Sequence, residues 1–65
     1  MRNDLAARRQ GRGWSQGRLA DELGVSRQTV ISLEKGRFDP SLPLAFRIAA
    51  LFDCRIEDVF TPDGI

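Results

Sequence analysis

The chain has 65 residues, no histidine, one cysteine and a formal net charge of +1. These totals exclude an internal disulfide, a structural zinc site and a histidine-based catalytic site, so we expect neither an enzyme nor a bound metal or cofactor. No apolar run is long enough to span a membrane or to act as a secretory signal, which predicts one cytoplasmic domain, residues 1–65, stabilised by helix packing.

The N-terminal segment predicts a short first helix. Asn3 or Asp4 can cap it, and it runs to about Gln10, after which Gly11 and Gly13 break it. Trp14 comes just before the next predicted helix, and we expect its ring to pack on the core rather than on a DNA base.

Residues 16–35 predict two short helices joined by a tight turn. Ser15 can cap the first of them, and Gly24 can end it in the left-handed conformation that glycine adopts without steric cost. Ser26 can cap the second. The residues that face inward on this second helix are Val30 and Leu33. The arrangement is that of a helix-turn-helix, in which the second helix lies in the major groove of DNA.

The loop after this motif combines cations with an aromatic residue. Lys35 and Arg37 stand beside the second helix, where a phosphate backbone would run, although two solvated loop cations are the alternative. We expect Phe38 to cover the core.

The C-terminal third predicts two more helices. Ser41 can cap a fourth helix, whose apolar residues spread over an arc too wide for one small core. We expect Asp53 to end it in a left-handed conformation at some cost. A fifth helix is predicted at residues 55–60, followed by a turn or tail at 61–64. A short strand near the tail, paired with residues 1–3, stays open.

The charges are distributed unevenly along the chain. Residues 1–38 hold eight of the ten lysines and arginines and four acids, whereas residues 39–65 hold two cations and five acids. The asymmetry suggests one face for a polyanion and another that avoids it or meets a partner. Uneven solvation of an ordinary helical domain explains the same counts equally well.

Residue types and spacings then agree with a known class at many positions at once. The matching positions are Arg9, WSQ at 14–16, LA at 19–20, GVSRQTV at 24–30, LEKG at 33–36 and DPSLPLAF at 39–46. From about Leu5 to Phe60 the chain resembles the Cro and C1 repressor class of helix-turn-helix proteins, especially its very small bacterial and phage members. The resemblance implies an all-α fold, a compact five-helix bundle. It also implies a structural ion pair of Arg9 with Glu34 and a phosphate-clamping role for Gln16.

Two kinds of DNA contact are expected, one that sets position and one that reads sequence. The side chains expected to contact phosphate are Ser15, Gln16, Ser26, Thr29, Lys35 and Arg37. The side chains expected to read base edges are Arg27, Gln28, Ile31 and Ser32. The fork of Arg27 matches guanine, and the amide of Gln28 matches adenine. Ile31 is either a thymine-methyl contact or a spare core residue.

One recognition helix covers too few base pairs to single out a genomic site. We therefore expect a homodimer on a palindromic operator, with two recognition helices about 34 to 36 Å apart. The apolar residues predicted to form the dimer contact are Leu51, Phe52 and Phe60. The sequence thus predicts a DNA-binding transcriptional regulator, with repression favoured over activation and no small-molecule effector. An antitoxin or a protein-interaction module with the same fold is the alternative.

Overall fold

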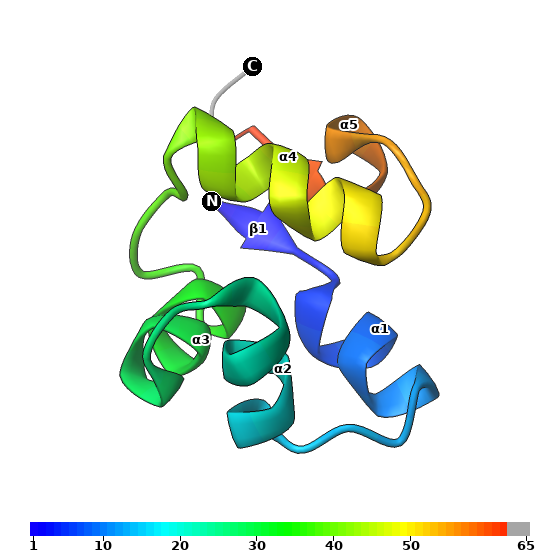
Figure 1. Ribbon diagram of the computed structural model, residues 1–65. Coiled ribbons are helices and arrows are strands. Elements are labelled where there is room, and N and C mark those ends of the chain that lie inside the picture. Colours follow the sequence, from blue (N-terminus) through cyan, green and yellow to red (C-terminus); the bar gives the residue numbers. More distant parts are fainter. Residues whose placement is uncertain (63–65) are drawn as a thin grey trace.

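The computed structural model describes residues 1–62, in which five helices and one two-stranded sheet are present (Figure 1). In chain order the elements are β1 (Arg2–Asn3), α1 (Leu5–Gly11), α2 (Gln16–Leu23), α3 (Arg27–Glu34), α4 (Leu42–Leu51), α5 (Ile56–Val59) and β2 (Phe60–Thr61). The predicted helical class is confirmed. The predicted turn at 61–64 lies partly outside the described residues.

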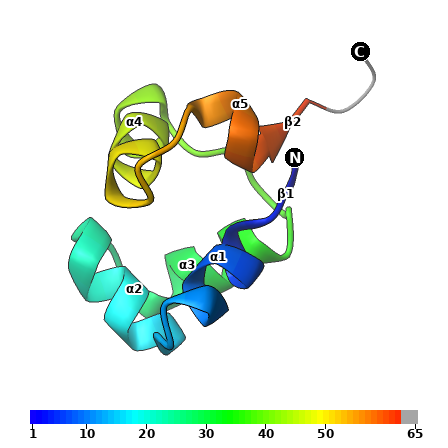
Figure 2. The ribbon, with the colours of Figure 1, turned by 90° about the vertical axis from the view of Figure 1, so that its right-hand side faces the viewer.

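The elements form two layers around one core. Figures 1 and 2 show α1, α2 and α3 together in one layer, α4 and α5 in the other, and the small sheet at the edge between them. The largest fully buried side chains come from both layers, namely Leu5, Leu19, Val30, Leu33 and Ile48. Burial of each such side chain contributes about 1.5 to 3 kcal/mol. Within residues 1–62, no helix combines the length and the apolar character needed to cross a membrane.

Three serine caps fix where α2, α3 and α4 begin. The hydroxyl oxygens of Ser15, Ser26 and Ser41 each accept a hydrogen bond from the backbone N–H of the residue three positions later. The N–O distances are 3.0, 3.1 and 3.3 Å. Each bond satisfies a donor that has no partner within the helix. Gly24 ends α2 with a φ of 71°, as expected. The predicted starts of these helices are therefore confirmed.

The first helix begins with one of the two predicted caps and ends one residue later than predicted. Its cap is the Asn3 side chain, whose Oδ1 accepts the N–H of Leu5 at 3.0 Å, whereas Asp4 makes no side-chain cap. Gly11 is part of α1 instead of breaking it, whereas the chain turns at Gly13, as predicted, with a φ of 71°. An isolated glycine costs a helix only about 1 kcal/mol relative to alanine, which the last turn tolerates.

At the C-terminal end, the expected left-handed conformation of Asp53 is confirmed, whereas the fifth helix is shorter than predicted. Asp53 has a φ of 52°, in the left-handed region. The fifth helix ends before Phe60, which pairs instead with Asn3 in the antiparallel sheet that the sequence left open. Arg55 offers no hydroxyl cap, and its backbone N–H is accepted at 2.9 Å by the carboxylate of Asp58.

The prediction that Phe38 covers the core is wrong. Its side chain is 40% exposed, and it is not part of the core cluster. Met1 packs against the core, and its amino group pairs with the carboxylate of Asp39 at 3.1 Å. The loop is thus fixed by its acidic residue, and Phe38 stays at the surface.

Candidate nucleic-acid interface

The outward side of α3 begins with two exposed polar side chains. Arg27 and Gln28 lie in its first turn in contact with solvent, whereas Val30 and Leu33 on the other side are completely buried. The Arg27 guanidinium has no ion-pair partner among residues 1–62. Its donors are therefore available to a ligand.

One turn further along, Ile31 and Ser32 continue this row. Both are half-buried, and Ile31 lies outside the core cluster. The Gln28 amide donates to the Ser32 hydroxyl at 3.5 Å, a long hydrogen bond that holds the amide only weakly. The residues expected to read bases thus share one side of α3.

At the start of α3, a pair of hydroxyls combines capping with a spare donor. The Oγ of Ser26 accepts the N–H of Thr29, and the two hydroxyl oxygens lie 2.9 Å apart. One hydroxyl donates to the other, so the second hydroxyl hydrogen remains available to an anion at this helix N-terminus.

The ion pair of Arg9 with Glu34 that the resemblance implies is present, at the end of α3. The Nε of Arg9 lies 2.7 Å from one oxygen of Glu34, and its Nη2 lies 3.3 Å from the other. The two side chains are only 12% and 7% exposed, so the fork geometry is held in a largely water-excluded position. The pair ties α1 to the last residue of α3.

The same carboxylate also holds Gln16, the first residue of α2. The Nε2 of Gln16 donates to Glu34 at 3.1 Å, while the guanidinium of Arg9 donates to the backbone oxygen of Trp14 at 2.8 Å. Sequence reasoning missed the contact of Gln16 with Glu34. The sequence did offer one signal for this contact. A carboxylate can accept about four hydrogen bonds, and the expected pairing with one arginine would supply only two of them, so a further donor could be expected.

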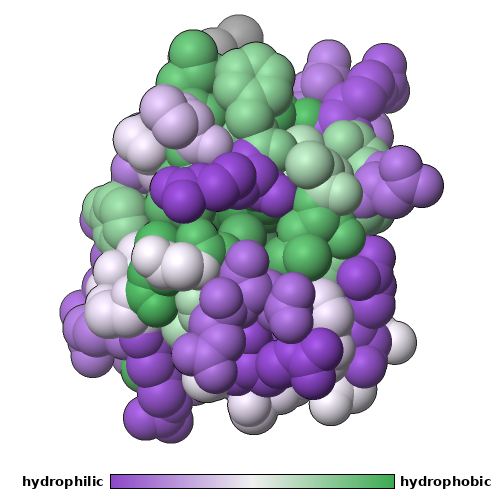
Figure 3. Space-filling model, in the orientation of Figure 1, coloured by the Kyte–Doolittle hydropathy of each residue, from purple (hydrophilic) through white to green (hydrophobic). Residues whose placement is uncertain are grey.

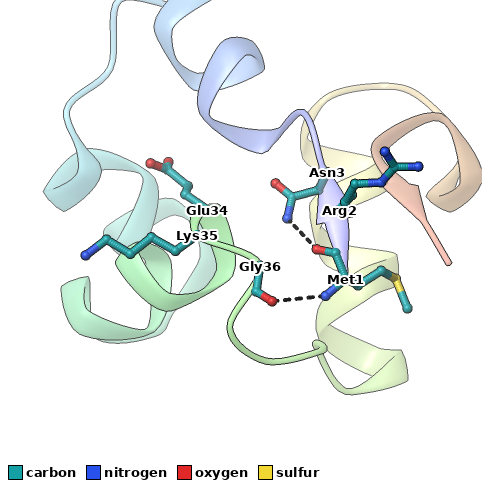
Figure 4. Close-up of a pocket in the computed structure, with 6 residues that line it drawn as sticks. All are labelled: Met1, Arg2, Asn3, Glu34, Lys35 and Gly36. Carbon is teal, nitrogen blue, oxygen red and sulfur yellow. Dashed lines mark hydrogen bonds between the residues drawn. The ribbon is translucent and has the colours of Figure 1, made fainter. Parts of the chain in front are cut away.

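The segment after α3 is anchored to β1 (Figure 4). The amino group of Met1 donates to the backbone oxygen of Gly36 at 3.1 Å, and the Asn3 amide donates to that of Leu33 at 2.8 Å. Gly36 has a φ of 69°, and a Cβ there would lie 3.1 Å from the Met1 oxygen. A side chain at this position would therefore be strained both by the left-handed conformation and by the close approach to Met1.

The two cations of this segment remain exposed. Figure 4 shows Lys35 extending away from Met1 and Asn3, which line the other side of a hollow of about 310 Å³. Arg37 is exposed as well and has no ion-pair partner in the described part of the chain. Both side chains can reach outward to an anion next to the end of α3.

Two of the three residues predicted for the dimer contact are buried within the single chain. Phe52 and Phe60 are 8% and 4% exposed and belong to the core of the single chain, and Leu51 is half-buried. The ring of Phe52 packs against that of Trp14, with centroids 6.0 Å apart. The large apolar side chains that do contact solvent include Leu42 and Phe46 on α4.

The sequence pattern of the helix-turn-helix family matches residues 5–59 of the chain. The chain belongs to the helix-turn-helix family. The match includes every helix from α1 to α5, and the resemblance to the Cro and C1 class is confirmed at this level.

Other members of the helix-turn-helix family are similar over most of their length. An uncharacterized HTH-type transcriptional regulator of Methanocaldococcus jannaschii is 53% identical over 92% of this chain and 91% of its own. One of Methanothermobacter thermautotrophicus is 52% identical over 97% and 93%, respectively. A crystal structure described as a hypothetical transcription factor from Neisseria superposes with a TM-score of 0.75 at 27% identity. That match covers 85% of this chain and 62% of the other.

Proposed function

We propose that the protein regulates transcription by binding double-stranded DNA, with α3 in the major groove. The observation that carries the proposal is the exposure of Arg27 and Gln28 at the first turn of α3, above a buried inner face. Membership in the helix-turn-helix family and the names of its relatives as transcriptional regulators support it.

Base reading falls to the row on α3. Arg27 can donate two bonds to guanine, and Gln28 can both donate to and accept from adenine. Ile31, outside the core, can contact a thymine methyl group, and the Ser32 hydroxyl completes the row.

Phosphate contacts flank the row at both ends. At the start of α2, Ser15 is exposed, and Gln16 keeps one amide hydrogen after its bond to Glu34. The residues proposed for the remaining phosphate contacts are Ser26, Thr29, Lys35 and Arg37. Glu34 accepts hydrogen bonds from both Arg9 and Gln16, so one carboxylate joins the end of α3 to the start of α2. The groove contact and the backbone contact are therefore set relative to each other before DNA binds.

A regulator of this kind needs two copies. Two half-sites of a palindrome about 34 to 36 Å apart supply the sequence information that one helix cannot read. Repression follows most simply, because a protein seated on a promoter excludes the polymerase.

Two substitutions distinguish base reading from phosphate contact. With DNA from the promoter of its own gene, Gln28→Ala should cost about 1 to 3 kcal/mol on the specific site and relax the preference at one position. Arg37→Ala should weaken binding to specific and random DNA alike and reduce the salt slope by about one unit. Fluorescence anisotropy across a salt series measures both effects. Identical effects of the two changes on both DNAs would overturn the division of roles.

A further inference from the structure

An aromatic side chain is exposed in the segment that connects α3 to α4. Phe38 is 40% exposed and lies outside the core cluster, and within residues 1–62 its ring takes part in no aromatic pair or cation–π contact. Figure 3 shows polar side chains over most of the lower layer, which holds α3, and apolar surface gathering over the upper one. A single exposed phenylalanine is ordinary on a protein surface, so its neighbours decide whether it has a role.

On one side, Phe38 is tied to the end of α3. The backbone N–H of Arg37 donates to the backbone oxygen of Ser32 at 3.0 Å, and that of Gly36 donates to the oxygen of Leu33 at the same distance. Ser32 is the last residue of the row proposed to read bases, so one hydrogen bond joins the end of that row to the residue before Phe38. The helix that is proposed to enter the groove therefore also sets the position of Phe38.

On the other side, the segment is bound to the N-terminal residues. The amino group of Met1 donates to the backbone oxygen of Gly36 (Figure 4) and pairs with the carboxylate of Asp39, both at 3.1 Å. Phe38 lies between these two anchored residues. A side chain whose backbone is fixed before binding loses less conformational entropy on binding than one in a loose loop.

The pair of Arg37 and Phe38 matches the two chemical parts of a DNA strand. Arg37 is an exposed cation without an ion-pair partner in the described part of the chain, and it suits a phosphate. The group between successive phosphates is deoxyribose, whose C–H groups present apolar surface. Protein contacts to the backbone go to sugar as well as to phosphate. Adjacent residues of the protein can thus contact adjacent groups of one strand.

We infer that Phe38 packs its ring against the deoxyribose next to the phosphate that Arg37 binds, and so positions the end of α3 on the DNA backbone. The inference rests on the proposed function, because it places α3 in the major groove. It adds to that function an apolar contact with the sugar. Every nucleotide of DNA carries the same sugar and the ring has no charge, so the contact strengthens binding to all sequences alike and does not change the salt dependence.

The affinity of Phe38→Ala separates sugar contact from the other two kinds. In fluorescence anisotropy across a salt series, Phe38→Ala should weaken binding to a specific half-site and to random duplex alike, roughly tenfold, which is the lower end expected for one partly buried phenylalanine. The salt slope should stay at the wild-type value, in contrast to Arg37→Ala. Phe38→Leu keeps part of the apolar contact and should lose less.

A control variant removes the same ring from the other layer. Phe46 is 59% exposed on α4, and Phe46→Ala should keep wild-type affinity for a single half-site. Circular dichroism checks that each variant is folded. Equal losses in Phe38→Ala and Phe46→Ala, or a reduced salt slope in Phe38→Ala, would contradict the sugar contact.

Hydroxyl-radical footprinting tests the contact itself, because these radicals cut DNA by removing hydrogen from deoxyribose. At saturating protein, Phe38→Ala should expose one or a few sugars that the wild type protects beside the phosphate of Arg37, and leave the rest of the footprint unchanged. Protection of every wild-type sugar by Phe38→Ala would overturn the inference. A DNA bend at that position that Phe38→Ala removes would also overturn it, since it would show the ring between base pairs.

The same measurements separate this inference from the proposed function. A wild-type protein that prefers no DNA sequence would refute the proposed function. A wild-type protein that prefers one half-site, together with a Phe38→Ala variant of equal affinity and identical footprint, would refute the sugar contact and leave the proposed function intact.

Discussion

The two layers of the molecule present opposite kinds of surface. On α3, Arg27 and Gln28 are exposed polar groups whose backbone is fixed by a serine cap at one end and a largely buried ion pair at the other. On α4, Leu42 and Phe46 are exposed apolar groups that no other element of the described chain covers. The polar row on α3 is formed within one chain, and it is the surface to which the proposed function assigns DNA contact. Leu42 and Phe46 leave apolar surface in contact with water, which costs about 25 cal/mol per Å².

The largest effect should come from the carboxylate that supports the polar row. Glu34→Ala leaves the largely buried guanidinium of Arg9 without its anion, and we expect a loss of about 3 kcal/mol in the free energy of unfolding. Urea denaturation followed by circular dichroism measures it.

The matched control for this prediction is an exposed pair on α2. Glu22→Ala breaks the 2.9 Å contact with Arg18, whose side chain is more than half exposed, and should cost below about 1 kcal/mol. Equal losses in the two variants would show that the Arg9 pair is not what holds α3 in place.

The helix ends of the two layers offer a second contrast. Gly24 and Asp53 both have left-handed φ values, 71° and 52°. Gly24→Ala should destabilise by about 1 kcal/mol, since an added Cβ would lie 4.0 Å from Nη1 of Arg47, an ordinary contact, and only the conformation is penalised. Asp53→Gly should stabilise by about 0.5 kcal/mol, because relief of strain exceeds the added entropy of the unfolded chain. Thermal melts compare both, and a stabilised Gly24→Ala variant would contradict the strain argument.

The smallest effect concerns the cap of α5 and depends on pH. Hydrogen bonds from the backbone N–H and then the side chain of Arg55 lower the pKa of Asp58. A carboxyl group whose pKa is lower in the folded protein than in the unfolded chain stabilises the fold. This stabilisation is fully present above the unfolded-state pKa of about 3.9, and it is lost as the pH falls through the folded-state pKa. Asp58→Ala should therefore reduce the melting temperature at pH 7 and have little effect below that range.

Asp21→Ala serves as the comparison for the Asp58 variant. Asp21 is exposed on α2 and makes no ion pair in the described part of the chain, so its removal should leave the melting temperature nearly unchanged at every pH. If the melting temperatures of the two variants still differed at acid pH, the ionised carboxylate of Asp58 would not be the stabilising species.

Sequence predicted the elements whose causes are local. The caps at Ser15, Ser26 and Ser41 and the turn at Gly24 depend on a few adjacent residues, and each is present. The exposed placement of Arg27 on α3 follows from helical periodicity in the same way.

The rest depended on contacts between distant residues. The apolar arc of α4 indicated a surplus of hydrophobic surface, but which part of the arc is buried depends on where α5 and β2 lie. Phe52 and Phe60 fill the core, and Phe46, four residues after Leu42 on the same stripe, faces solvent. The bonds of Asn3 to Leu33 and of Gln16 to Glu34 likewise join residues far apart in sequence.

Selection of bound fragments from a random pool of duplex DNA tests the central claim most directly. The account predicts that wild-type protein enriches one half-site, repeated as a palindrome, and that Gln28→Ala enriches the same site with the preference relaxed at one base pair. No enriched sequence, or the same unrelaxed sequence from both proteins, would contradict the reading of DNA by α3.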